Sequence, residues 1–115
     1  MEIIRFLDQS EFIDDYRILE FRNFPSGRYY RLEILFTDQS ILHAREYLSP
    51  SERNYAYHWM NKNKKLIIRW DNSPHHPAIQ TFPHHKHENE KISESQELTL
   101  KDVIAFIENR LHSMQ

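Results

Sequence analysis

Apolar and polar residues alternate along much of the chain, and short polar turns separate the alternating stretches. The alternation covers residues 28–37, 41–48, 54–60 and 65–70, and residues 16–23 have the composition of a further strand. A period of two is that of a β-strand, whose successive side chains point to opposite faces. Polar breaks such as 38–40 and 61–64 suit the tight turns between antiparallel strands. The pattern predicts an antiparallel meander of about five strands, with one packed face and one partly wet face.

Helical periodicity replaces this alternation at both ends of the chain. Ile3 and Ile4 share helical spacing with Leu7, which favours a short N-terminal helix over the alternative of a strand followed by a turn and a helix. Thr99, followed three residues later by Asp102, is a loose capping box for a C-terminal helix. The apolar stripe of that helix consists of Leu100, Val103, Ile104, Ile107 and Leu111. We expect both helices on the apolar face of the sheet, in an α+β fold that forms a single domain over residues 1–115.

The segment from residue 69 to residue 87 follows neither period. It holds five of the eight histidines and three of the five prolines. Proline fixes φ and donates no backbone hydrogen bond, which excludes the interior of a helix or of a central strand. Trp70, Ile79 and Phe82 are apolar anchors, so we expect an ordered loop held against the sheet. Residues 88–97 are polar and aperiodic, which predicts a linker or a mobile loop.

Composition narrows the function classes. The chain has no cysteine, which excludes disulfides, thiolate zinc sites and cysteine nucleophiles. Its only glycine is Gly27, whereas phosphate-binding loops need several. No apolar run approaches the ~20 residues of a membrane span, and the start does not resemble a secretion signal, so we expect a cytoplasmic protein without membrane contact. With a formal charge of −2, any contact with nucleic acid requires a local basic patch.

Such a patch is predicted on the polar face of the sheet, where Arg31, Glu33, His43, Arg45 and Arg69 gather if the strands pair in sequence order. One interpretation is a solvated face with weak cross-strand ion pairs. The other is a shallow surface for RNA, with arginines for phosphate and aromatic rings for unpaired bases. The aromatic residues available for stacking, or equally for the core, are Tyr29, Tyr30, Tyr55, Tyr57 and Trp59. The candidate substrate-binding residues are Arg31, Arg45, Tyr57, His58 and Lys86.

The histidine segment has three interpretations. Imidazoles titrate near neutrality, so one could accept the proton of an RNA 2′-hydroxyl while another protonates the leaving oxygen, without any metal. Alternatively, His85 and His87 could supply two ligands to a metal ion, although the spacing matches no zinc signature. The third interpretation is structural, with imidazoles that cap loop carbonyls. We favour the first, which requires no cofactor; its candidate catalytic residues are His75, His76, His84, His85 and Arg69.

Several motifs together resemble the TumE family, small toxins of two-gene toxin–antitoxin systems. The similar segments are Arg45–Tyr47, Tyr55–Trp59, Arg69–Pro77, Thr81–His87 and the Thr-Leu-x-Asp-Val start of the helix at Thr99. The resemblance implies a cytoplasmic prokaryotic protein whose antitoxin partner is a helix-turn-helix DNA binder. It implies no mechanism; a ribonuclease is suggested by analogy with other small toxins.

The resulting hypothesis is a toxin that cleaves RNA as a metal-independent ribonuclease. Two alternatives remain open: a non-catalytic protein that blocks a cellular target, and a histidine-ligated metal-dependent enzyme. Whether the protein forms a homodimer is also left open.

Overall fold

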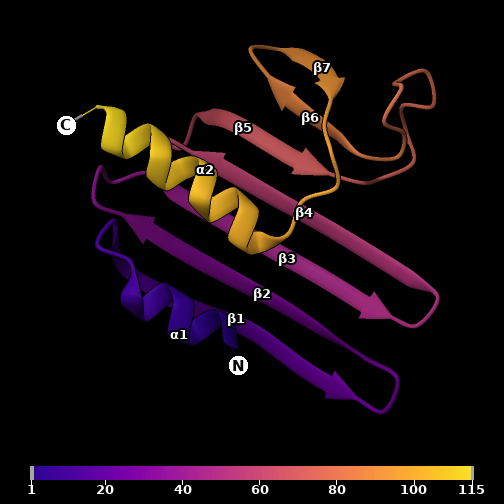
Figure 1. The fold of residues 1–115 in the computed structure, drawn as a ribbon, viewed down its shortest axis with the longest axis horizontal. Coiled ribbons are helices and arrows are strands. Elements are labelled where there is room, and N and C mark those ends of the chain that lie inside the picture. Colours follow the sequence, from indigo (N-terminus) through magenta and orange to yellow (C-terminus); the bar gives the residue numbers. More distant parts are fainter. Residues whose placement is uncertain (1, 115) are drawn as a thin grey trace.

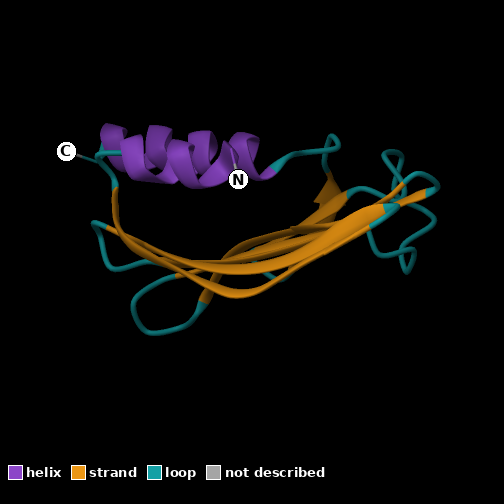
Figure 2. Cartoon of the chain, turned by 90° about the horizontal axis from the view of Figure 1, so that it is seen from below, coloured by secondary structure: helices purple, strands orange, loops and turns teal. Residues whose placement is uncertain are grey.

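A computed structural model describes residues 2–114 as one antiparallel sheet with two helices on one of its faces (Figures 1 and 2). The strands follow one another in sequence order across the sheet, each paired with the next. The elements are α1 (Glu2–Gln9), β1 (Ile13–Phe24), β2 (Gly27–Phe36), β3 (Ile41–Ser49), β4 (Glu52–Met60), β5 (Leu66–Asp71), β6 (His85–Glu88), β7 (Lys91–Glu94) and α2 (Leu100–Ser113). The predicted α+β meander is confirmed, but it has seven strands rather than about five.

The two additional strands form a small hairpin after the histidine–proline loop. β6 takes its residues from the end of that loop, and β7 lies in the segment for which a linker had been predicted. Asn89 and Glu90 make the turn between them, with φ values of 54° and 62°. Two consecutive positive φ values define the type I′ turn, which suits a two-residue hairpin but usually contains glycine. The prediction of a linker or loop was wrong for residues 88–94, because Asn-Glu lacks the glycine that signals such a turn, whereas residues 95–97 have no regular secondary structure.

The C-terminal helix begins as the capping box predicts. The Thr99 hydroxyl accepts a hydrogen bond from the backbone N–H of Asp102 at 3.2 Å, and the Asp102 carboxylate accepts one from the Thr99 N–H at 2.8 Å. Each bond satisfies a backbone donor that the first turn leaves unpaired. The predicted apolar stripe of α2 is buried in full. None of the helices within residues 2–114 is long and apolar enough to cross a membrane.

The hydrophobic core lies between the helices and the sheet. From α1, Leu7 enters it, and α2 contributes the whole of its stripe. The sheet contributes the predicted inward residues, among them Leu32, Ile34, Tyr57 and Trp59. Of the five aromatic residues that were candidates for stacking, only Tyr29 is not buried here. The aromatic rings therefore build the core rather than a surface for bases.

Polar contacts, more than apolar anchors, fix the histidine–proline loop. Trp70 is buried as expected, but the Phe82 side chain is 44% exposed and does not anchor the loop. Instead, the Thr81 hydroxyl donates to the His84 carbonyl at 2.6 Å and accepts from the Ser95 N–H at 3.0 Å. Thr81 thus ties the end of the loop to the chain beyond β7.

Candidate functional site

One face of the sheet is covered by no helix of the described chain and carries most of the predicted chemistry (Figure 2). We call it the open face. Strand pairing arranges its side chains in two rows, because directly paired residues point to the same side. One row is Glu33, His43, His58, Arg69 and His87, and the other is Arg31, Arg45, Ala56, Asp71 and His85. Residues from five strands thus meet on one surface.

A hollow of about 330 Å³ lies at the centre of the open face. It sits over Ala56, whose methyl group leaves a gap between the longer side chains of Arg45 and Asp71 in its row. The polar side chains around the hollow belong to Arg31, His43, Arg45, His58 and Arg69. Among the described residues that line it there are three arginines and no carboxylate.

The charges near β1 neutralise one another. Arg17 Nε donates to Glu33 Oε1 at 3.0 Å, and His43 Nε2 lies 3.0 Å from Glu33 Oε2. The hydrogen bond from Arg17 lowers the pKa of Glu33, with a further contribution from His43. Arg45, in contrast, is exposed and forms no hydrogen bond or ion pair with its side chain anywhere in residues 2–114. Its guanidinium is available to an anion from solution.

Arg69 links the centre of the open face to the histidines beyond it. Its Nε donates to Asp71 Oδ2 at 3.1 Å, the pairing that their shared face predicted. Its Nη1 donates to His58 Nδ1, also at 3.1 Å. Burial lowers the pKa of His58, and the charge of Arg69 lowers it further. His58 is therefore neutral at pH 7, accepts a hydrogen bond at Nδ1 and carries its hydrogen on Nε2, where it can donate to a ligand.

Three histidines converge at the β6 end of the open face. His76 comes from the loop, and His85 and His87 come from alternate positions of β6. One ring nitrogen of each lies within 4.8 Å of those of the other two. We call this group the histidine cluster. Desolvation by burial lowers the pKa of His87, and the neighbouring His85 and Arg69 lower it further, against the opposing effect of Asp71.

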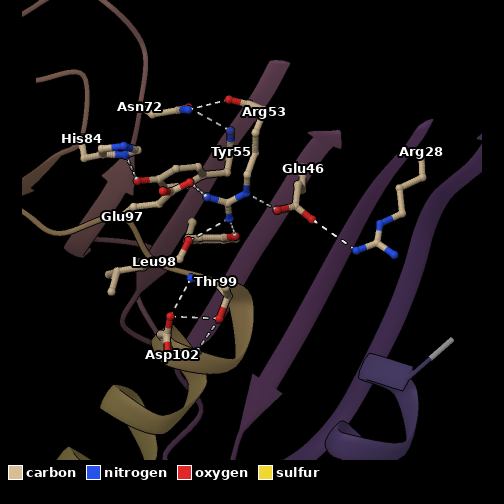
Figure 3. Close-up of polar contacts among 11 residues, drawn as sticks. Arg28, Glu46, Arg53, Tyr55, Asn72, His84, Glu97, Leu98, Thr99 and Asp102 are labelled. Atoms are coloured by element: carbon tan, nitrogen blue, oxygen red, sulfur yellow. Dashed lines mark hydrogen bonds and ion pairs between the residues drawn. The ribbon is translucent and has the colours of Figure 1, made fainter. Parts of the chain in front are cut away.

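The other predicted site residues lie elsewhere. His75 is exposed in the loop, one residue from the cluster but outside it. His84 points to the helix side, where its Nδ1 is 2.7 Å from the Tyr55 hydroxyl (Figure 3). Tyr57 is fully buried in the core, and Lys86, paired with the buried Trp70, also faces the helix side. The alternation of side chains in β4 and β6 separates Tyr57 and Lys86 from the open face.

Sequence reasoning missed the main polar network of the helix side (Figure 3). Arg53 donates to Glu46 at 2.7 Å, to Glu97 at 3.0 Å, to the Tyr57 hydroxyl at 2.9 Å and to the Leu98 carbonyl at 2.8 Å. Its guanidinium also lies over the Tyr55 ring, 4.3 Å from the centroid. The network joins β4 to the segment that leads into α2. No signal near Arg53 in the sequence indicates partners more than forty positions away.

Arginine forks bind phosphate oxygens, a neutral imidazole can donate to them, and paired imidazoles can exchange protons with substrate. The open face brings all three groups together. The predicted residues that it combines are Arg31, Arg45, His58, Arg69, His76 and His85, and it adds Asp71 and His87, which the sequence pattern places on the same face.

Comparison with known proteins agrees with the resemblance in the sequence. The family model described as Toxin TumE matches residues 3–111, nearly the whole chain. No curated protein and no solved structure matches the chain. The matched region includes the sheet, the histidine–proline loop and all but the last residues of α2. The chain therefore belongs to the TumE family of toxins.

Proposed function

We propose that the protein is the toxin of a two-gene toxin–antitoxin system and acts as a ribonuclease on its open face. The observation that carries the proposal is the hollow lined by three arginines, which lies beside a cluster of three histidines. RNA offers such a surface a polyanionic backbone and a reactive 2′-hydroxyl. The overall charge of −2 counts against strong binding of a polyanion, but among the described residues the lining of the hollow has three arginines and no carboxylate, which provides a local basic patch.

Arg45 and Arg31 hold the RNA backbone in this mechanism, and His58 donates its Nε2–H to a phosphate oxygen. Arg45 has no acidic partner in the described chain and binds as a free cation. Arg31 is partly neutralised by Glu20, whose Oε1 lies 3.5 Å from Arg31 Nε. Arg69 lies closest to the histidine cluster, so its charge stabilises the negative charge that develops on the phosphate. The scissile phosphate therefore lies between Arg69 and the cluster.

His76 and His87 act as the general base and the general acid of the cleavage step. Both are partly exposed, whereas His85 is 1% exposed and cannot reach RNA. One imidazole accepts the proton of the 2′-hydroxyl as its oxygen attacks phosphorus, and the other protonates the 5′-oxygen as its bond to phosphorus breaks. This step forms one P–O bond, breaks another and requires no metal ion.

Growth arrest after induced expression, followed by analysis of RNA from the arrested cells, tests the proposal. The informative variants are His76→Ala and His75→Ala, which remove neighbouring imidazoles inside and outside the cluster. We expect His76→Ala to abolish both arrest and RNA cleavage, since an acid–base group contributes about 10²–10⁴-fold. His75→Ala should retain both. Arrest with intact RNA would contradict a ribonuclease and favour a protein that blocks its target without catalysis.

A further inference from the structure

We propose that the histidine cluster is also a binding site for a divalent transition metal such as zinc, and that an ion bound there switches off the cleavage. The switching part rests on the proposed function, whereas the metal site itself does not. The site consists of His76, His85 and His87, with the Asp71 carboxylate beside them.

The spacing of the cluster suits one shared ion. In a tetrahedral zinc site with bonds of about 2.0–2.1 Å, ligand atoms lie roughly 3.3 Å apart. The three histidine nitrogens lie within 4.8 Å of one another, so small side-chain rotations bring them to that separation. Each oxygen of Asp71 approaches one of these histidines, with Oδ1 3.0 Å from His85 Nε2 and Oδ2 3.6 Å from His87 Nε2.

His85 provides an independent indication of a ligand. Its ring is 1% exposed, and its Nδ1 lies 2.9 Å from the Pro83 carbonyl oxygen, which can only accept a hydrogen bond. Nδ1 therefore carries a hydrogen, and in the neutral form of the ring the lone pair of Nε2 is free to bind a metal ion. A backbone carbonyl that fixes the tautomer in this way is one of the common outer partners of a metal-binding histidine, besides carboxylates and water.

Within residues 2–114, His85 Nε2 has no hydrogen-bond partner, although Asp71 Oδ1 is 3.0 Å away. A proton shared by two atoms must lie near the line between them. A metal ion bound to both lies well off that line, at the centre of its coordination shell. A buried nitrogen and a carboxylate oxygen that are close but poorly aligned for a hydrogen bond thus fit a shared cation.

Asp71 is held in place for this role. Its Oδ1 accepts hydrogen bonds from the backbone N–H of Ser73 at 3.0 Å and from the Ser73 hydroxyl at 2.8 Å. Its Oδ2 accepts from Arg69 Nε at 3.1 Å. These donors orient the carboxylate, but they also occupy its lone pairs and reduce its negative charge. The three imidazoles are therefore the principal ligands, and Asp71 is a fourth ligand or a close outer partner.

Metal binding and proton transfer compete for the same nitrogens. A lone pair that coordinates an ion cannot accept a proton, and His76 and His87 are the proposed proton carriers. Occupancy of the cluster therefore removes both groups from the cleavage step. Arg45 is not a ligand of the ion and remains available to RNA.

Titration calorimetry with zinc chloride on the purified, chelator-treated full chain tests the site. We expect one ion per chain, and at least tenfold weaker binding for His76→Ala and for His87→Ala. His75→Ala is the matched control and should bind like the unaltered protein. Circular dichroism of each variant separates loss of ligand from loss of fold. Absence of stoichiometric binding, or equal weakening by His75→Ala, would overturn the site.

An RNA cleavage assay with the same preparations tests the switch. We expect cleavage in the presence of a chelator and its loss on addition of one equivalent of zinc. Cleavage that requires zinc would confirm the site but overturn the switch and the metal-free mechanism. Zinc binding without cleavage under either condition would leave the site standing and contradict the ribonuclease.

Discussion

At the scale of single residues, Arg45 is the clearest test of RNA binding on the open face. It is exposed and has no polar partner in the described chain, so Arg45→Ala should change the free energy of unfolding by no more than about 0.5 kcal/mol. Loss of one phosphate contact should lower the slope of log K against log salt by about 0.7 for single-stranded RNA. Fluorescence anisotropy with 2′-O-methyl RNA, which cannot be cleaved, measures that slope at several salt concentrations.

The control for this variant is Arg5→Ala on α1, which removes the same charge from an exposed position away from the open face. Its salt slope should equal that of the unaltered protein. If both variants lower the slope equally, RNA responds to total charge, and the open face is not a specific binding surface.

Single residues also show where sequence reasoning succeeds and where it ends. Arg69 and Asp71 were expected to pair because both flank Trp70 on one face of a strand, and they do. Phe82 was expected to be buried because it is large and apolar, yet the loop leaves it 44% exposed. A strand's period fixes the direction of every side chain, whereas an irregular loop has no period from which burial can be inferred.

At the scale of elements, Arg53 is the main polar link between the sheet and the start of α2. Its side chain is 17% exposed and bonds to Glu46, Glu97, Tyr57 and the Leu98 carbonyl. Arg53→Ala leaves these partly buried acceptors without a donor, and we expect it to lower the free energy of unfolding by about 2–4 kcal/mol. Urea denaturation measures the loss.

Arg53→Lys is the matched control, because it keeps the charge but loses the fork that bonds to several partners at once. It should recover only part of the stability. A loss below about 0.5 kcal/mol for Arg53→Ala would contradict the structural role of the network, since that is the size of an ordinary surface effect.

Buried tyrosines on β2 and β4 make the packed face of the sheet sensitive to alkali. Burial is the main cause that raises the pKa of Tyr30, Tyr55 and Tyr57 above the usual 10.0, and it raises the pKa of Tyr55 to about 12. Below pH 10 these tyrosines are neutral in the folded and in the unfolded protein. Above it the unfolded chain ionises first, so stability should fall by up to about 1.4 kcal/mol per pH unit for each tyrosine.

Urea denaturation between pH 9 and pH 11.5 measures this fall. Tyr57→Phe removes one of the three groups, so its stability should decline less steeply with pH than that of the unaltered protein. A free energy of unfolding that is constant above pH 10, or an unchanged slope in Tyr57→Phe, would show that these hydroxyls do not remain neutral in the folded state.

The elements differ in how far the sequence predicts them. The alternation of β2 to β5 and the apolar stripe of α2 predicted those elements to within about two residues, because a buried face imposes its period on the sequence. β6 and β7 are short, polar and at the edge of the sheet, where little is buried. Without a buried face no period is imposed, and the hairpin that carries His85 and His87 was missed for that reason.

At the scale of the whole molecule, the proposed antitoxin should cover the open face with an acidic surface. The hollow of that face is lined by Arg31, Arg45 and Arg69 and by no carboxylate of residues 2–114, and charge complementarity mainly accelerates association. Raised salt should therefore slow the association of toxin and antitoxin more than it speeds their dissociation. Surface plasmon resonance at several salt concentrations separates the two rates. An interface confined to the outer face of α2 would contradict direct blocking of the site.

The histidine cluster also depends on the whole molecule. Histidines 76, 85 and 87 had each been noted in the sequence, but only the return of the chain from the loop into β6 brings the first beside the other two. The register of β5 with β6 then sets them against Asp71 and Arg69. Such a group depends on pairing between distant segments, which a local pattern does not specify.

The chemistry of the RNA ends after cleavage tests the central claim most directly. Attack by the 2′-oxygen leaves a 2′,3′-cyclic phosphate on one fragment and a 5′-hydroxyl on the other. Mass spectrometry of a short RNA incubated with the purified protein and a chelator should therefore find these two ends, and a substrate with 2′-deoxyribose at the cleaved position should stay intact. Fragments with 3′-hydroxyl and 5′-phosphate ends, or RNA that remains whole, would contradict the account.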